Sequence, residues 1–214
     1  MSNISQRILT SFPLLIIAIY AIYNSFILVL SLFIISSILI YEFSNIVKKI
    51  FKKNKTSSFI FLNLFIFYIC LFASQIYFFL GGEIENKQIV FSFILLICIF
   101  TDVGGYIFGN IIKGKKLTTI SPNKTYAGMF GSFICSLIIC SLFIIYFNFS
   151  INYIFFTLLI SLVSQVGDLF ISYLKRKAYI KDTGNFLPGH GGLLDRFDGI
   201  IFAIPLGIKI FIFF

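Results

Sequence analysis

The stretch ILTSFPLLIIAIYAIYNSFILVLSLFIISSILIY, residues 8–41, contains no charged side chain. As a single helix it would be about 51 Å long at roughly 1.5 Å per residue, whereas the hydrocarbon core of a bilayer is about 30 Å thick. Asn24 and Ser25 offer a break inside it. The stretch therefore predicts two short membrane spans, residues 8–23 and 25–42, joined as a hairpin.

The rest of the chain continues this apolar pattern. Of its 214 residues, 59% are hydrophobic and 12% are charged, and the mean hydropathy is +1.02. Soluble domains are only about 45–50% apolar, so the composition predicts an all-α polytopic integral membrane protein. Further spans are predicted at residues 58–80, from residue 89 onward, and at 126–147, 151–173 and 199–214, which gives about seven transmembrane helices.

Polar segments between the spans suggest two domains. Residues 1–88 would hold the N-terminal spans and a basic loop at 48–55. Residues 89–214 would form a catalytic transmembrane domain with polar loops at 113–125 and 175–198.

The positive charges predict the orientation of the chain in the membrane. The formal net charge is +9, which in a soluble protein would suggest a nucleic-acid partner. Here the cations lie between spans, so topology and anionic membrane lipids explain them better, and no nucleic acid is expected. With a cytoplasmic N-terminus, every Lys and Arg except Lys87 and Lys209 falls on the cytoplasmic side. Both polar loops of the second half would therefore be cytoplasmic.

The segment SYLKRKAYIKDTGNFLPGHGGLLDRFD, residues 172–198, carries many charges between long apolar runs. Its PGHGG sequence lets the backbone turn tightly and approach a ligand closely. The chain's single histidine, His190, lies there and could bind phosphate, orient a ligand or close the turn. The candidate catalytic residues of this segment are Lys175, Arg176, Lys181, Asp182, His190, Asp195, Arg196 and Asp198.

Two further aspartates, Asp102 and Asp168, lie within apolar segments. An ionised carboxylate there is costly and needs a partner or a bound cation. An interhelical hydrogen bond or salt bridge would satisfy it, but several carboxylates on one cytoplasmic face favour a metal. Ligands that are all oxygen suit Mg²⁺, which is usually bound through carboxylates and substrate phosphates.

The spacing of these residues supports a common site. If the sixth span continues as a helix, Asp168, Ser172 and Lys175 recur at i, i+4 and i+7 on one face. Asp195 and Asp198 would share a face if the seventh helix starts near residue 193. The alternative for this pair is capping of a helix N-terminus.

A second polar segment, ISPNKTYAG at residues 120–128, precedes the fifth span. Ser121, Lys124 and Thr125 offer hydroxyl and ammonium donors, and helix N-terminal amides favour an anion. The segment lacks the GxxxxGK[ST] pattern of a P-loop, so Walker-type nucleotide hydrolysis is not supported.

The pattern S-x-L-K-R-x₄-K-D-x-G-x₂-L-P-x-H-G-G-L-x-D-R-F-D of residues 172–198 resembles the signature of the phosphatidate cytidylyltransferases, or CDP-diacylglycerol synthases. TDVGGYIFGN from Thr101, SPNKTYAG from Ser121 and GDL from Gly167 resemble further blocks of that family in the expected order. The resemblance covers roughly residues 100–200. Two positions depart from it, because Ala127 and Ile171 stand where members often carry glutamate.

The resemblance implies an Mg²⁺-dependent reaction of CTP with phosphatidic acid, giving CDP-diacylglycerol and pyrophosphate in phospholipid biosynthesis. Asp168, Asp195 and Asp198 would be the metal ligands, with a second cation left open. Lys175, Arg176 and Lys181 would contact phosphates, and the expected substrate-binding residues are Ser121, Lys124, Thr125, Ser172 and Asp102. The expected location is the inner (plasma) membrane of a bacterium, with the active site facing the cytoplasm and a homodimer left open.

Elementary chemistry agrees with this reaction. Two polyanionic substrates repel each other, so the site must neutralise charge and align the reactants, which Mg²⁺ and Lys or Arg do. Two other functions remain open. One is a membrane enzyme that uses CTP on another lipid phosphate, such as an archaeol or polyprenol derivative. The other is a transporter in which Asp102 and Asp168 handle ions, although that would not explain the dense cytoplasmic motif.

Overall fold

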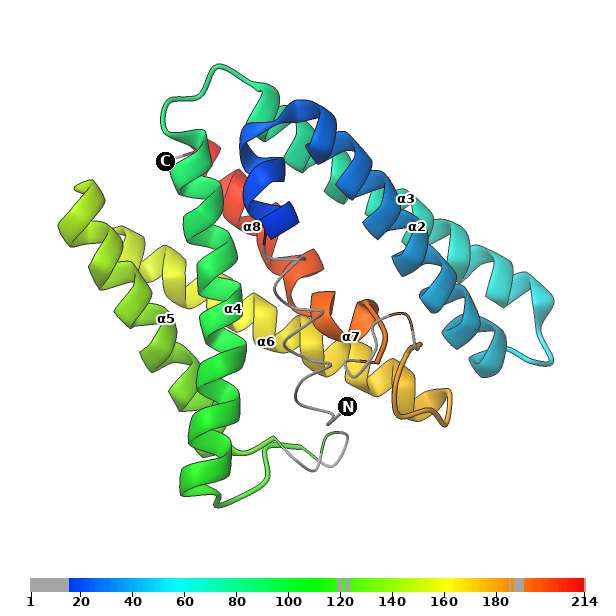
Figure 1. Ribbon diagram of the computed structural model, residues 1–214. Coiled ribbons are helices and arrows are strands. Elements are labelled where there is room, and N and C mark those ends of the chain that lie inside the picture. The colour runs from blue at the N-terminus through cyan, green and yellow to red at the C-terminus, as the bar shows by residue number, and fades with distance from the viewer. Residues whose placement is uncertain (1–15, 119–120, 122–123, 185, 187–190, 214) are drawn as a thin grey trace, which may run out of the picture. The chain divides into compact units, whose positions relative to one another are not determined.

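A computed structural model describes residues 16–118, 121, 124–184, 186 and 191–213 (Figure 1). Its named elements are all helices, and five of them are long and apolar enough to cross a membrane. The five are α2 (Ser25–Ile50), α3 (Lys55–Gly81), α4 (Lys87–Ile112), α5 (Tyr126–Phe147) and α6 (Tyr153–Lys177). The prediction of an all-α polytopic integral membrane protein is confirmed.

The predicted break at Asn24 is also confirmed. Residues 16–23 are helical, and Asn24 then adopts an extended conformation with φ −125° and ψ 112°. Its side-chain oxygen accepts hydrogen bonds from the backbone amides of Phe26 and Ile27 at 3.0 and 3.2 Å, which caps α2. The beginning of the predicted span 8–23 lies outside the described residues.

Several helices extend beyond the predicted apolar spans. α2 continues to Ile50 rather than ending at residue 42, and α6 continues to Lys177 rather than to residue 173. The basic loop predicted at 48–55 thereby shrinks to residues 51–54. Lysines in a last helical turn complement the helix dipole, and their aliphatic stems can cover apolar surface, so charge does not stop these helices.

The last predicted span, 199–214, corresponds to α8 (Ile200–Phe213), and a break in the helix precedes it. A short helix, α7 (Leu194–Phe197), is followed by α8, with Asp198 and Gly199 between them. The expectation that one helix carries Asp195 and Asp198 on a shared face is therefore wrong. α8 has 14 residues, fewer than the roughly 20 that cross a bilayer upright.

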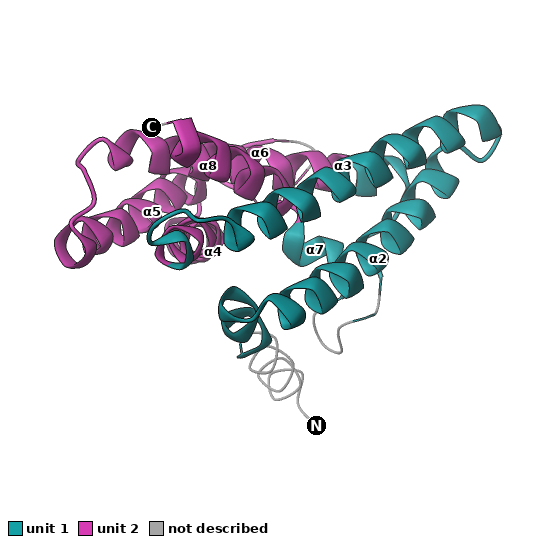
Figure 2. Cartoon of the chain, turned by 90° about the horizontal axis from the view of Figure 1, so that it is seen from above, with its two compact units in different colours: residues 1–88, 174–197 teal, residues 89–173, 198–214 magenta. Residues whose placement is uncertain are grey.

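The chain forms two compact units, coloured separately in Figure 2. Unit 1 comprises residues 1–88 and 174–197, and unit 2 comprises residues 89–173 and 198–214. One division falls after residue 88, and residues 174–197 cluster with the N-terminal helices. The predicted domains stay a prediction.

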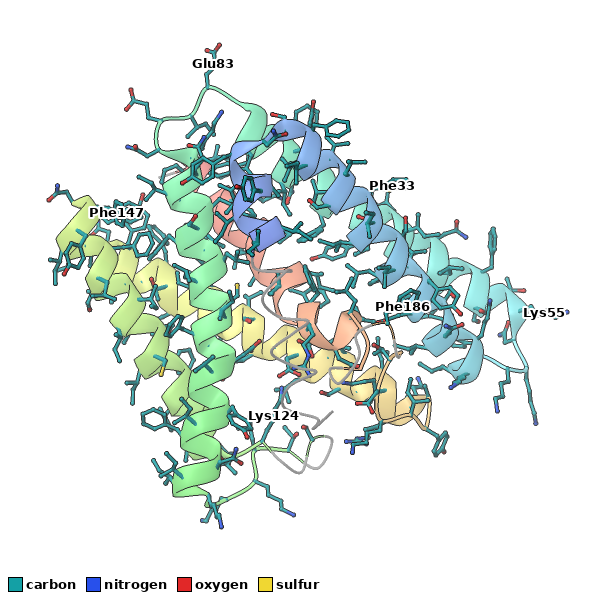
Figure 3. All side chains as sticks on the ribbon, viewed as in Figure 1. Phe33, Lys55, Glu83, Lys124, Phe147 and Phe186 are labelled. Atoms are coloured by element: carbon teal, nitrogen blue, oxygen red, sulfur yellow. The ribbon has the colours of Figure 1, made fainter. Side chains whose placement is uncertain are left out.

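Unit 1 is built on the pair of helices α2 and α3, and α2 also contacts α7. The rings of Phe43 and Phe65 stack with their centroids 3.7 Å apart, beside fully buried Ile46 and Ile69. Figure 3 shows Lys55 and Glu83 at opposite ends of α3. The basic loop before α3 and the acidic loop after it therefore lie at opposite ends of this helix.

In unit 2, α4 and α5 approach through small residues. A Cβ added to Gly104 would lie 2.9 Å from the Cβ of Cys135, and one added to Gly128 would lie 2.8 Å from the carbonyl oxygen of Gly105. Such small residues allow close approach of membrane helices. Ser132 Oγ of α5 also donates to the Thr101 carbonyl of α4 at 2.7 Å.

α6 and α8 complete unit 2. The Thr101 hydroxyl of α4 donates to Ser161 Oγ of α6 at 2.9 Å. Gly207 of α8 lies against Ile94, whose Cγ2 would be 2.8 Å from an added Cβ. These contacts join α6 and α8 to α4 within unit 2.

Candidate active site

In unit 1, the carboxylate of Asp195 connects several parts of the polar segment 174–197. Lys175 Nζ, in the last turn of α6, donates to Asp195 Oδ1 at 2.7 Å. Asp195 Oδ2 accepts from the backbone amides of Thr183 and Gly192 at 2.8 and 3.2 Å. The carboxylate thus ties a helix end to two separate parts of the following loop, and it fixes the ammonium group of Lys175.

A second carboxylate, that of Glu42 in α2, binds the same loop, although Glu42 lies far earlier in the sequence. Its Oε1 accepts from the Leu193 amide at 2.9 Å, and its Oε2 accepts from the Leu194 amide at 2.8 Å. The Thr183 hydroxyl lies 2.7 Å from the same Oε2. Glu42 is fully buried. In the sequence Glu42 is the last residue of the predicted span 25–42, and its one signal is that it is the first acidic residue of the chain, directly after the long uncharged run.

The other charged residues of the motif lie at the surface of unit 1. Lys181, Asp182, Arg176 and Arg196 are all exposed, and both arginines take part in interactions. Lys177 Nζ lies 6.0 Å from the ring centroid of Phe51. His190 lies outside the described residues, so its predicted role stays a prediction.

In unit 2, Lys124 and Asp168 form an ion pair between the loop before α5 and the middle of α6. Figure 3 labels Lys124 in this loop. Ser172 Oγ lies 3.4 Å from Asp168 Oδ1, one turn farther along α6. The predicted spacing of Asp168, Ser172 and Lys175 on one continuous helix is confirmed, because α6 runs through all three.

The loop before α5 is folded back on itself, which positions Lys124. The Leu117 amide donates to the Lys124 carbonyl at 2.8 Å, and Lys116 pairs with Thr125 in an antiparallel bridge. Thr125 caps α5, its hydroxyl accepting from the Gly128 amide at 3.1 Å. Ser121 accepts the Lys124 amide through its carbonyl at 3.0 Å. Asp102 of α4 is exposed and takes part in an interaction.

The start of α8 packs tightly on α6 beside Asp168. A Cβ on Gly167 would lie 2.8 Å from the Asp198 carbonyl oxygen, and one on Gly199 would lie 2.8 Å from the Ser164 carbonyl oxygen. Asp198 is buried, and its Oδ1 accepts from the Gly199 amide at 2.9 Å. The tight contacts of Gly167 and Gly199 accompany the helix break, because a side chain at either glycine would meet the facing backbone.

Unit 2 contains oxygen donors of the kind that bind Mg²⁺ in proteins. Asp168 and Asp198 offer carboxylate oxygens, and the buried Ser164 Oγ beside them has no hydrogen-bond partner within the described residues. Oxygen donors of this kind suit Mg²⁺. The described residues contain no group of three or more His, Cys, Asp and Glu arranged to hold a metal. The three-aspartate ligand set of the sequence analysis stays a prediction.

Comparison with known proteins extends the resemblance over the whole chain. Residues 5–214 match the model of the cytidylyltransferase family. The chain belongs to the cytidylyltransferase family. Both Lys–Asp pairs of this family member lie within the matched region, and so does Glu42 in its N-terminal half.

Curated relatives include phosphatidate cytidylyltransferases of three staphylococci. That of Staphylococcus haemolyticus is 41% identical over 134 residues, which are 61% of this chain and 51% of the relative. That of Staphylococcus saprophyticus is 45% identical over 122 residues, 55% of this chain and 46% of the relative. That of Staphylococcus epidermidis is 42% identical over 124 residues, 56% and 47% respectively. The aligned part of this cytidylyltransferase-family chain thus spans about half the length of the curated relatives it matches.

Proposed function

We propose that the chain is a phosphatidate cytidylyltransferase, which transfers the cytidylyl group of CTP to phosphatidic acid. The observation that carries the proposal is the family match over residues 5–214, within which both polar motifs form Lys–Asp pairs. The relatives named for this activity support the same substrates. The proposed location is the bacterial plasma membrane, with the motif loops on the cytoplasmic side, where CTP is available.

The reaction needs charge neutralisation more than proton transfer. A phosphate oxygen of phosphatidic acid attacks the α-phosphorus of CTP, the bond from that phosphorus to the bridging oxygen breaks, and pyrophosphate leaves. The attacking group is already an anion, so no strong general base is required. This chemistry agrees with a chain whose single histidine is His190.

Lys175 and Lys124 are the best-positioned cations for this task. Each ammonium is held by an aspartate, Asp195 for Lys175 and Asp168 for Lys124. A cation that is oriented before the substrate arrives stabilises developing charge without reorganisation during the reaction. We assign Lys175 and Lys124 to phosphate oxygens of CTP, with Arg176 and Lys181 as further phosphate contacts.

Asp168 and Asp198 would hold Mg²⁺, with Ser164 Oγ as a third oxygen donor in the same unit. When bound, this ion would neutralise phosphate charge and align the reactants. Asp195 was predicted as a further ligand. It lies in unit 1, where it accepts from Lys175 and from the loop amides of Thr183 and Gly192, and the proposal assigns it the orientation of Lys175.

The decisive experiment is an assay of the purified protein in lipid nanodiscs with CTP and defined lipid phosphates. Formation of CDP-diacylglycerol and pyrophosphate from phosphatidic acid, dependent on Mg²⁺ and abolished by EDTA, is expected. An archaeol-type phosphate and a polyprenyl phosphate serve as competing acceptors. Product from one of these alone would contradict the proposed substrate, and ion transport without CTP turnover would favour a transporter.

A further inference from the structure

Glu42 is a buried carboxylate that the reaction scheme does not yet use. It lies in α2, is fully buried, and accepts hydrogen bonds from two consecutive backbone amides, those of Leu193 and Leu194. Burial of a carboxylate costs free energy unless its oxygens are hydrogen-bonded. Among the described residues, the hydrogen-bond partners of Glu42 all lie within residues 183–194, which we call the motif loop. This arrangement indicates that Glu42 does more than fill space in α2.

The loop is shaped to receive this carboxylate. A Cβ added to Gly184 would lie 2.6 Å from Glu42 Oε1, and one added to Gly192 would lie 2.6 Å from Glu42 Oε2. Any side chain at either glycine would therefore displace the carboxylate or the loop. The two glycines and Glu42 form a matched contact between α2 and the motif.

Thr183 connects Glu42 to the ion pair of the candidate site. Its hydroxyl lies 2.7 Å from Glu42 Oε2 and 3.1 Å from Asp195 Oδ2, so its single hydrogen can be donated to either carboxylate. Leu194, whose amide Glu42 binds, directly precedes Asp195 in the chain. Displacement of Glu42 would thus reach Asp195 through both the Thr183 side chain and the backbone.

We propose that Glu42 is a positioning residue for the cytidylyl transfer, acting on Lys175 through Thr183 and Asp195. This inference rests on the proposed function. Glu42 contacts neither substrate in the scheme; it fixes the loop that orients the Lys175 ammonium. Through Glu42, α2 of the N-terminal half thereby supports the orientation of Lys175.

The test compares Glu42→Gln with Glu83→Gln in nanodiscs. Glu83 is an exposed glutamate of the α3–α4 loop, so the same chemical change is made outside the loop contact. For Glu42→Gln we expect kcat per folded enzyme to fall roughly 10- to 100-fold, because misplacing a catalytic group by about 1 Å can cost that much. The KM for CTP should rise while the KM for phosphatidic acid stays within about twofold, a separation that simple loss of folded protein cannot produce. Glu83→Gln should match the wild type.

Thr183→Val and Thr183→Ser provide a second test that leaves α2 unchanged. Valine removes the Thr183 hydroxyl, so Thr183→Val should reproduce the kinetic pattern of Glu42→Gln. Serine keeps a hydroxyl, so Thr183→Ser should retain most of the wild-type activity. Wild-type kinetics in both Glu42→Gln and Thr183→Val would overturn the proposal. So would a loss of activity that only follows the folded fraction, with an unchanged KM for CTP.

Amide hydrogen exchange separates this inference from the proposed function. Peptides covering residues 191–197 should exchange faster in Glu42→Gln than in Glu83→Gln, because the Leu193 and Leu194 amides lose a charged acceptor. If the wild type fails to convert CTP and phosphatidic acid, the proposed function fails, and the exchange comparison alone decides whether Glu42 positions the loop. Equal exchange in the two variants would refute the positioning role of Glu42.

Discussion

The ammonium of Lys175 lies 2.7 Å from Asp195 Oδ1, and the two side chains are only 15% and 9% exposed. A pair this shielded is screened by salt far less than an exposed one. Because Asp195 is in turn held by two loop amides, Lys175 has a fixed direction before any substrate binds.

Replacing Lys175 tests whether its oriented ammonium group contributes to catalysis. Lys175→Ala should lower kcat about 100- to 1000-fold, since it removes a preorganised cation from the developing charge. The measurement is steady-state CDP-diacylglycerol formation. Lys177→Ala, two residues farther at the end of the same helix and beside the ring of Phe51, is the matched control and should change kcat less than about threefold. Equal losses in both variants would indicate a general requirement for positive charge rather than a specific contact.

The ion pair of Lys124 with Asp168 leads to a parallel expectation in unit 2. Lys124→Ala should lower kcat/KM for CTP by roughly 10- to 100-fold, because a charge-assisted phosphate contact is lost and Asp168 is left without its cation. Lys115→Ala changes an exposed lysine of the same folded loop and serves as the control. A Lys124→Ala enzyme with unchanged kcat/KM would remove Lys124 from the site.

Ser164 offers a test of the metal assignment that leaves the carboxylates in place. Ser164→Ala should raise the Mg²⁺ concentration needed for half-maximal activity about 10-fold, the effect expected when a group around a metal is removed. Thr157→Val alters another buried hydroxyl two turns earlier on α6 and should leave the Mg²⁺ dependence unchanged. Identical Mg²⁺ titrations of the two variants would argue against a metal beside Ser164.

The close contact of α4 with α5 predicts a stability effect without a direct change in chemistry. Gly104→Ala would press a methyl group against the Gly131 backbone and the Cys135 side chain, and should destabilise the protein by about 1–3 kcal/mol. Gly81→Ala is the control, since nothing lies within 4 Å of its added Cβ at the end of α3. Thermal unfolding in detergent would measure the difference, and equal midpoints would show that α5 can move aside.

Much of the helix content follows from local sequence. The span 126–147 coincides with α5, and the Asn24 break appears as a capped helix start, because apolar runs and capping residues act over a few positions. The one-face spacing on α6 is likewise a local property of a continuous helix.

The connections inside the site depend on packing that local sequence does not encode. The break between α7 and α8 requires Gly199 to meet α6 at Ser164, and the Lys124–Asp168 pair joins positions 44 residues apart. Glu42 is the clearest case, because its amide partners lie in a loop that the sequence marks as a separate motif. A single glutamate at a span end gave no indication of them.

The hydrogen bond from the Leu194 amide to Glu42 joins residues 152 positions apart, which has a consequence for biogenesis. At synthesis rates of about 5–20 residues per second, Glu42 would enter the membrane roughly 8–30 s before its partners exist. Throughout that interval the nascent α2 carries Glu42 without the two backbone amides that it binds in the folded protein. The contact between α2 and this loop can therefore form only after residues 193–194 have left the ribosome.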